Sequence, residues 1–292
     1  MRLTSDAGEI VRQIGRSERK LLTAFIGYPQ SIARSIADGV ENSGAVSPSS
    51  FPAQEWFRET LAEHATNGVQ AGYAYSGEQL LAYLRKLRAG LPDKATFAAN
   101  PVQYRLPLDA EDVDGIIAEH EDITVRPVRG LEWYKTRALE LARVTSADLL
   151  KEAERRVTDA LRAGQGLREI AAGLRETFPV FTKARLENIA RTESAHLFNA
   201  GRWDFYQQSG AVWGYRFRAI RDERTTQICT SLDGSTFPKG EEAGRVPPLH
   251  FQCRSTLDPV LWTEAAAEGW QWKVRDGALP AMTGFGSLPD AG

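Results

Sequence analysis

The sequence contains few of the residues that most often carry out chemistry in proteins. Its 292 residues include four histidines and only two cysteines, Cys229 and Cys253. Two cysteines in a chain kept in a cytoplasm are expected to be reduced or metal-bound rather than joined in a structural disulfide. The chain contains no glycine-rich phosphate loop, no HExxH motif and no recognisable Ser/His/Asp arrangement. The common signatures of nucleotide hydrolases, zinc peptidases and serine hydrolases are therefore excluded.

The sequence also lacks long apolar runs and a strong excess of either charge. No run approaches 18 apolar residues, so no transmembrane helix and no membrane partner are expected. The first residues lack the apolar segment of a signal peptide, which indicates a protein made and kept in a cytoplasm. A net charge of −2 excludes a globally basic nucleic-acid coat, although a local basic face remains open.

Hydrophobic periodicity predicts a mainly helical body for residues 1–209. Apolar side chains recur every three or four positions through much of this region. Pro29 is expected to break or kink the first helical pattern. Ser76 opens a capping-box pattern after a stretch punctuated by Gly72, which predicts a helix that begins at Ser76. Later helices are predicted at three places: Trp133–Ala163, Leu167 to about Pro179, and Thr182 to about Gln208.

Beyond residue 210 the pattern changes from helical to alternating. Trp213 and Tyr215 begin an alternation of aromatic with small or charged residues, which predicts a half-buried strand. A short helical segment capped by Asp222 or Thr225 and a second strand at 255–260 are expected to follow. The predicted fold class is therefore α+β and predominantly α-helical, with a helical N-terminal body and a small C-terminal α+β unit holding a Cys/His cluster.

Both cysteines and one histidine lie close together in this small unit. His250 and Cys253 have the spacing that lets two ligands at a turn reach one ion, and Cys229 can supply a third ligand. Zinc takes such ligands tetrahedrally and a structural site requires four, so Asp222, Asp233 or water is the candidate fourth ligand. A disulfide between the cysteines and two unliganded buried thiols are the alternatives. A nucleophilic cysteine with His250 as base is disfavoured because no third group orients the base.

Two further sets of charged residues invite an interpretation. Glu193 falls on the apolar face of the last predicted helix, where a carboxylate needs a partner. An ion pair with Arg191, Arg224 or Arg254 is therefore predicted.

Four arginines close in sequence are candidates for contacting nucleic-acid phosphates, although exposed arginines on the solvated side of a strand are the commoner arrangement. They are Arg216, Arg218, Arg221 and Arg224.

Several short motifs, taken in order, resemble a known family. They are Ile189-Ala190-Arg191-Thr192-Glu193, Asn199, Gly201-Arg202, Asp222-x-Arg224-Thr225, Cys229, Asp233-Gly234, Pro247-Pro248-x-His250 and Cys253-Arg254. Their order and spacing resemble the phage Mu F-like minor head protein family, also called phage head morphogenesis proteins. The resemblance covers roughly Leu106 to Val260. The family's usual pattern has a Cys or His where Cys229 stands, an interchange that a metal site tolerates.

This resemblance implies a component of the head of a tailed phage or prophage, not an enzyme. Such proteins are low in copy number, associate with the portal protein and the major capsid protein, and act in head assembly, DNA packaging or delivery. The expected location is the virion head at the portal vertex, after assembly in the bacterial host cytoplasm, with packaged DNA as a further candidate partner. The alternative functions are a metal-dependent nuclease, disfavoured because the cluster has one histidine, and a DNA-binding module.

The resemblance also divides the chain. The first region is expected to be the partner-specific part, which the small Cys/His unit does not need in order to fold. The predicted regions are 1–105, a helical N-terminal region; 106–210, the helical core of the Mu F-like region; 211–261, the α+β Cys/His unit; and 262–292, a C-terminal tail.

Overall fold

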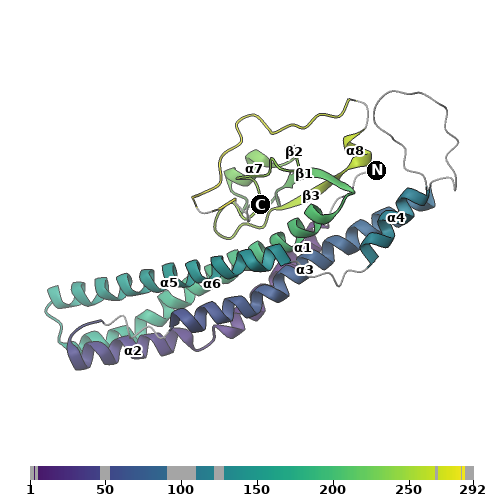
Figure 1. Ribbon diagram of the computed structural model, residues 1–292. Helices are drawn as coiled ribbons and strands as arrows, with labels where there is room; N and C mark the ends of the chain where they lie inside the picture. The colour runs from purple at the N-terminus through teal and green to yellow at the C-terminus, as the bar shows by residue number, and fades with distance from the viewer. Residues whose placement is uncertain are drawn as a thin grey trace. The chain divides into compact units, whose positions relative to one another are not determined.

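The protein is predominantly helical, with one small antiparallel sheet near its C-terminal end (Figure 1). The computed structural model describes residue 3 and residues 6–46, 53–90, 110–121, 128–266, 269–283 and 285–286. The helices are α1 (Ala7–Ala24), α2 (Tyr28–Ser43), α3 (Ala53–Ala89), α4 (Ala110–Glu121), α5 (Val128–Arg162), α6 (Leu167–Gln208), α7 (Gln227–Leu232) and α8 (Trp262–Ala265). The strands are β1 (Val212–Arg218), β2 (Thr236–Pro238) and β3 (Thr256–Leu261). The predicted α+β class is confirmed.

Contacts group the chain into two units, and each unit takes segments that are distant in sequence. Unit 1 takes Met1–Gln13, Gly68–Gly130 and Ala195–Gly292, and unit 2 takes Ile14–Asn67 and Leu131–Ser194. The predicted region boundaries at 105, 210 and 261 remain predictions, because long helices contribute residues to both units. Among the described helices, none combines the length and the apolar character needed to cross a membrane.

Unit 2 is held together by an apolar core between helices. Side chains one helical turn apart face this core from α2, α5 and α6, as expected for amphipathic helices. The core includes Ile32, Ile36, Val40, Leu149, Ala153, Val157, Ile170, Leu174 and Phe178. Phe178 directly precedes Pro179, which has no backbone N–H to donate. The buried Phe178 ring therefore holds α6 in the core next to this missing hydrogen bond.

Two helices run through positions where the sequence predicted a boundary. Pro179 lies inside α6, so the predicted break between two helices there is wrong. Ser76 is fully buried in the middle of α3, so the predicted helix start at Ser76 is also wrong. A proline inside a helix costs one hydrogen bond and a steric clash. Burial of the flanking residues Leu174 and Phe178 offsets that local cost, since tertiary packing routinely overrides helix propensity.

Glycines bring the α3 and α6 backbones into contact within unit 1. A Cβ atom at Gly72 would lie 1.9 Å from the carbonyl oxygen of Phe198. A Cβ atom at Gly201 would lie 1.9 Å from the carbonyl oxygen of Val69. No side chain larger than hydrogen fits at either position, so Gly72 serves close helix packing rather than punctuation of the helix.

The sheet has the strand order β2-β1-β3, with β1 in the centre and both pairings antiparallel (Figure 1). Tyr215 in β1 is opposite Phe237 on one side and Pro259 on the other. An irregularity in the pairing between Val212 and Gly214 inserts one extra residue. Val212 is consequently buried while Trp213 is 43% exposed, so the predicted alternation holds from Tyr215 onward but not at Trp213.

The described residues that follow α8 pack against the sheet and loops of unit 1, to which they belong. Lys273 and Thr236 exchange two hydrogen bonds, which fix the segment beside β2. Further along, the Met282 backbone N–H donates to the carbonyl of Leu249 at 2.9 Å, within the loop that carries His250. The ring of Trp272 lies where a side chain at Gly214 would otherwise point.

Candidate metal centre

Cys229 is presented by the first turn of α7. Thr226 is the N-cap of this helix, and its hydroxyl accepts a hydrogen bond from the Cys229 backbone N–H at 3.5 Å. The predicted caps, Asp222 and Thr225, instead close the preceding turn, where the Asp222 N–H donates to the Thr225 hydroxyl at 2.9 Å. The cap differs from the prediction because the Asp222 carboxylate is already engaged by Arg254 and by the backbone of Arg224.

His250 and Cys253 are presented by a tight turn. The Cys253 backbone N–H donates to the carbonyl of His250 at 3.3 Å, which closes the turn. Gln252 lies within it at φ 58°, the left-handed conformation that such turns often require. The spacing of two intervening residues therefore works as the sequence predicted, because the turn directs both side chains to one place.

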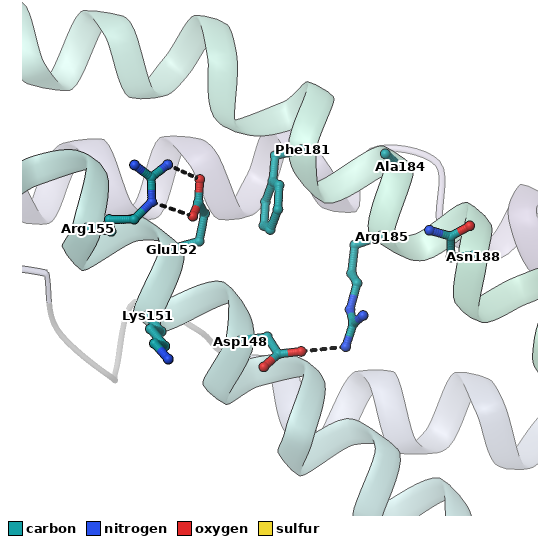
Figure 2. A pocket seen from close by; sticks show the side chains of 8 residues that line it. All are labelled: Asp148, Lys151, Glu152, Arg155, Phe181, Ala184, Arg185 and Asn188. Carbon is teal, nitrogen blue, oxygen red and sulfur yellow. Dashed lines mark hydrogen bonds and ion pairs between the residues drawn. The ribbon is translucent and has the colours of Figure 1, made fainter. Parts of the chain in front are cut away.

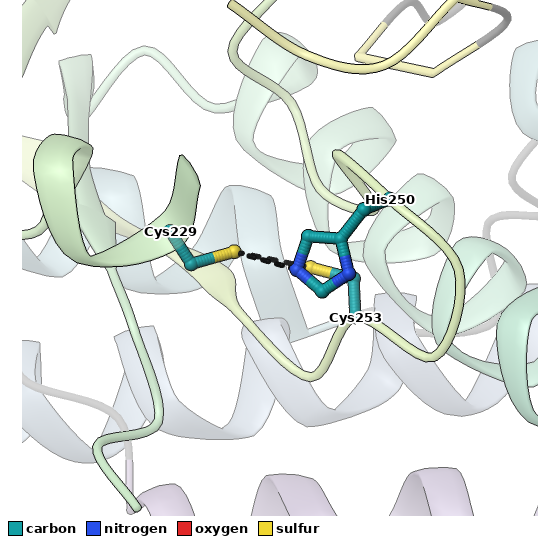
Figure 3. Close-up of side chains that lie close together, drawn as sticks. All are labelled: Cys229, His250 and Cys253. Carbon is teal, nitrogen blue, oxygen red and sulfur yellow. Dashed lines mark hydrogen bonds between the residues drawn. The ribbon is translucent and has the colours of Figure 1, made fainter. Parts of the chain in front are cut away.

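The three side chains meet in one buried group (Figure 3). The Cys229 Sγ lies 3.1 Å from His250 Nε2 and 3.6 Å from Cys253 Sγ. The two cysteines are 1% exposed and His250 is 8% exposed. In a tetrahedral zinc site, metal–ligand bonds of about 2.3 Å to sulfur and 2.0 Å to nitrogen place the ligand atoms roughly 3.5–3.8 Å apart. The donor atoms are thus close to the separations that one shared ion requires.

The orientation of His250 suits metal binding. Its Nδ1 lies 2.7 Å from the carbonyl oxygen of Phe251, which can only accept, so Nδ1 carries the proton. Nε2 is then the unprotonated nitrogen in the neutral ring, and it faces the cysteines. Metal-bound histidines are commonly held by this type of backbone hydrogen bond.

The electrostatics of the group concentrate negative charge on one sulfur. Burial raises the pKa of Cys253, but Cys229 and the protonated form of His250, whose own pKa is raised, bring it well below its ordinary value. The hydrogen bond to Cys253 and burial raise the pKa of Cys229. Two cysteine sulfurs and one imidazole are a donor set that fits a soft divalent cation, whose binding would release the protons that the group still holds.

The structure does not bring either candidate aspartate to this group. The Asp222 carboxylate forms a two-point ion pair with Arg254. The Asp233 carboxylate accepts from the Ala219 backbone N–H at 2.8 Å and pairs with Arg221 at 2.6 Å. Among the His, Cys, Asp and Glu side chains of the described residues, only the two cysteines and His250 meet in this group.

The four arginines proposed for phosphate contact are mostly engaged by carboxylates. Arg216 pairs with Glu264, and Arg218 pairs with Asp258 at 2.9 Å. Arg221 pairs with Asp233. Arg224 is exposed, and its backbone N–H donates to Asp222. Since three of the four charges are already neutralised locally, the arrangement offers little net attraction for a polyanion.

Glu193 is buried and ion-paired as predicted, but with a different partner. It is 2% exposed and forms two hydrogen bonds to Arg137, at 2.7 and 2.9 Å. The predicted partners Arg191 and Arg254 pair instead with Glu18 and Asp222. Arg137 lies on α5, far away in sequence, and no local pattern indicates which helix will pack against Glu193.

Two polar residues of α6 fasten the Cys/His unit to the helix. The Asn199 amide donates to the carbonyl of Ser255 at 3.1 Å and accepts from the Thr256 hydroxyl at 2.7 Å. Arg202 is buried and donates to the carbonyl of Leu257 at 3.0 Å. The motif containing these residues was visible in the sequence, but their partners on β3 depend on the fold and could not be identified from it.

A groove of about 510 Å³ on unit 2 contains no residue predicted as functional (Figure 2). Arg185 of α6 pairs with Asp148 of α5, Arg155 pairs with Glu152 one turn away on α5, and Lys151 also lines the groove. Phe181 supplies an apolar wall. The groove therefore presents mixed charge and no recognisable catalytic arrangement among its described residues.

A match to a protein family covers the end of α5, α6 and most of the sheet region. Residues 151–258 match the family described as Phage Mu protein F like protein. An uncharacterized protein of Methanocaldococcus jannaschii is 29% identical over 104 residues, which span 36% of this chain and only 16% of that protein. No solved structure matches the chain. The matched residues include Cys229, His250 and Cys253, and residues 151–258 are similar to the phage Mu F-like family.

Proposed function

We propose that the protein is a minor head protein of a tailed phage or prophage. The observation that carries this proposal is the match of residues 151–258 to the phage Mu F-like family. In this proposal the protein is present in few copies at the portal vertex of the head. It binds the portal protein or the major capsid protein and acts in head assembly, DNA packaging or delivery rather than in catalysis.

The placement of the matched polar residues supports a structural role. Asn199 and Arg202 are buried and hold β3 against α6, rather than lining an open cleft. Glu193 is likewise buried, in its ion pair with Arg137. A family motif used for internal fastening fits a protein that must keep its shape in a particle, where binding surfaces rather than a catalytic pocket are needed.

We further propose that Cys229, His250 and Cys253 bind a structural zinc ion. The support is the donor set, its burial and the orientation of His250. When bound, the ion would cross-link α7 to the turn that carries His250 and Cys253, in the manner of structural zinc sites. The alternative disulfide would require the two sulfurs to move from 3.6 Å to about 2.05 Å apart.

The structure offers less support for the two alternative functions. A metal-dependent nuclease needs a histidine or carboxylate available to activate water. In the Cys/His cluster, both nitrogens of His250 already have partners. A DNA-binding module needs exposed cationic side chains, whereas Arg216, Arg218 and Arg221 are ion-paired.

Purified phage heads provide the decisive test. Procapsids and virions made with and without the gene would be separated on gradients and analysed by mass spectrometry. We expect the protein in heads at a small fraction of the capsid protein, and co-purification of a tagged copy with the portal protein. Absence from both particles would contradict the proposal, as would efficient DNA cleavage by the isolated chain with added Mg²⁺, Mn²⁺ or Zn²⁺.

A further inference from the structure

The three cysteine and histidine ligands leave one tetrahedral position to be filled, and a fourth side chain lies beside them. Ser255 is only 3% exposed and follows Cys253 by two residues. Side chains two residues apart in an extended chain point to the same face. The Ser255 side chain lies close enough to the Cys229 thiol to lower the pKa of that thiol, which places it beside the ligand on the other side of the group.

The backbone around Ser255 is held so that this hydroxyl has little freedom to leave. Its carbonyl oxygen accepts from the Asn199 amide at 3.1 Å. The next residue, Thr256, donates its hydroxyl to the same Asn199 side chain at 2.7 Å. Because Asn199 lies on α6, the helix fixes Ser255 against Cys229 from one side while β3 begins on the other.

The other hydroxyl close to Cys229 is already committed. Thr226 is the N-cap of α7, and its oxygen accepts from the Cys229 backbone N–H. Moving that hydroxyl would break the cap of α7. Asp222 and Asp233 are held by arginines. Among the described residues, Ser255 is therefore the side chain best placed to complete the site.

We propose that the Ser255 hydroxyl occupies the fourth ligand position of the Cys229–His250–Cys253 site, which makes it a site of two sulfurs, one nitrogen and one oxygen. This inference depends on the proposed metal site. A neutral hydroxyl is a weaker ligand than a thiolate, so the site binds zinc less tightly than a site with three cysteines and one histidine. Replacing this one oxygen with sulfur should convert it into the tighter site.

Cobalt(II) provides the test, because its absorption bands report the number of bound thiolates and the geometry. The full-length reduced protein, its Ser255→Cys variant and its Ser255→Ala variant would be titrated with Co²⁺. Zn²⁺ affinity would then be measured by competition with a chelator. We expect Ser255→Cys to raise the sulfur-to-cobalt absorption in proportion to three thiolates instead of two. It should also tighten zinc binding at least 10-fold, whereas Ser255→Ala should weaken binding several-fold.

Ser231→Cys is the matched control. It adds a thiol to α7 near Cys229, but the Ser231 hydroxyl bonds the Ile228 carbonyl and the Leu279 backbone N–H, not the cluster. We expect neither its cobalt spectrum nor its zinc affinity to change. Circular dichroism of each variant shows whether it has folded.

The results distinguish a wrong fourth ligand from a wrong metal site. If the parent protein binds cobalt through two thiolates and Ser255→Cys adds neither absorption nor affinity, Ser255 is not at the fourth position and the inference is wrong. If the folded parent protein gives no thiolate band and binds no zinc, the metal site itself is wrong. An increase in the Ser231→Cys control equal to that of Ser255→Cys would also overturn the inference.

Discussion

Arg137 and Glu193 form an ion pair in which the Glu193 carboxylate is almost completely buried. Arg137→Ala would leave the Glu193 carboxylate, 2% exposed, without this partner. Breaking such a pair costs roughly 3–5 kcal/mol, so we expect a loss of that order in the free energy of unfolding from urea denaturation. Arg191→Ala is the control, because its pair with Glu18 is far more exposed and is worth at most about 1 kcal/mol. Equal effects of the two substitutions would contradict the interpretation.

Glu152 contributes a pH-dependent part of the stability of unit 2. Its hydrogen bonds to Arg155 and Arg156 outweigh partial burial and lower the pKa of Glu152 to about 2, from an ordinary value of 4.5. The unfolded chain therefore binds more protons between these values, and stability is lost as the pH falls from about 4.5 towards 2. Glu152→Gln should make the melting temperature vary less with pH over this range. Glu154→Gln, which removes a charge from an exposed position on the same helix, should leave the slope unchanged.

Cys253 tests the contribution of the metal to folding. With the free ion at about 100 times its dissociation constant, binding adds roughly 2.7 kcal/mol to the stability of the folded state. A chelator should therefore lower the melting temperature of the parent protein. Cys253→Ala should melt at a lower temperature with or without the chelator. A chelator effect of the same size on both proteins would show that the stabilising ion is bound elsewhere.

The sequence predicted local relations between residues better than distant ones. The meeting of His250 with Cys253 follows from a turn of four residues, and this relation was visible in the spacing. The partner of Glu193 was not, because Arg137 reaches it only through the packing of α5 on α6. The hydroxyl of Ser255 beside Cys229 likewise depends on a contact between α6 and β3.

Helix boundaries were predicted from local signals, and two of those signals were overridden by packing. Pro179 and Ser76 carry features that usually end or begin a helix, yet both lie inside long helices. The sequence does not state how strongly the neighbouring turns are buried. The strand at Tyr215 was predicted correctly because its period of two survives from that residue on, whereas the extra residue at Trp213 has no local signature.

The glycine contact between α3 and α6 gives a sharp test at this scale. Gly201→Ala should destabilise the protein by at least about 3 kcal/mol, because overpacking costs roughly 1–3 kcal/mol even where atoms can move, and here the obstacle is backbone. Gly173→Ala is the control on the same helix. Nothing lies within 4 Å of the place that its new methyl group would take, so it should stabilise the helix by about 1 kcal/mol. A neutral Gly201→Ala in thermal unfolding would contradict the close approach.

The N-terminal region is part of the core that surrounds the cysteines. Cys229 and Cys253 share one apolar cluster with several residues from the first hundred. Those residues are Leu3, Tyr73, Leu80, Tyr83 and Leu84. This shared core argues against the expectation that the Cys/His unit folds without residues 1–100. Each buried side chain of this size is worth about 1.5–3 kcal/mol, and the total stability of a domain is only about 5–15 kcal/mol.

Deleting residues 1–100 should therefore unfold the Cys/His unit rather than only remove a partner-binding part. We expect the truncated chain to lose its near-ultraviolet circular dichroism and to aggregate, and both cysteines to react rapidly with a thiol reagent. The intact protein, in which the two thiols are buried, is the control. Slow, protected reaction of both cysteines in a soluble truncated chain would show that the unit is independent after all.

Unit 1 takes its residues from before position 14 and from after position 194, together with a central segment. A ribosome adds about 5–20 residues per second, so the first helices emerge many seconds before the strands that complete their core. Contacts between such distant segments also form slowly, because closing a long loop costs entropy before any contact is gained. The Cys/His unit can therefore be assembled only after the segments beyond position 194 have been made. Until then the apolar faces of α3 remain uncovered, which makes the nascent protein a natural client for chaperones.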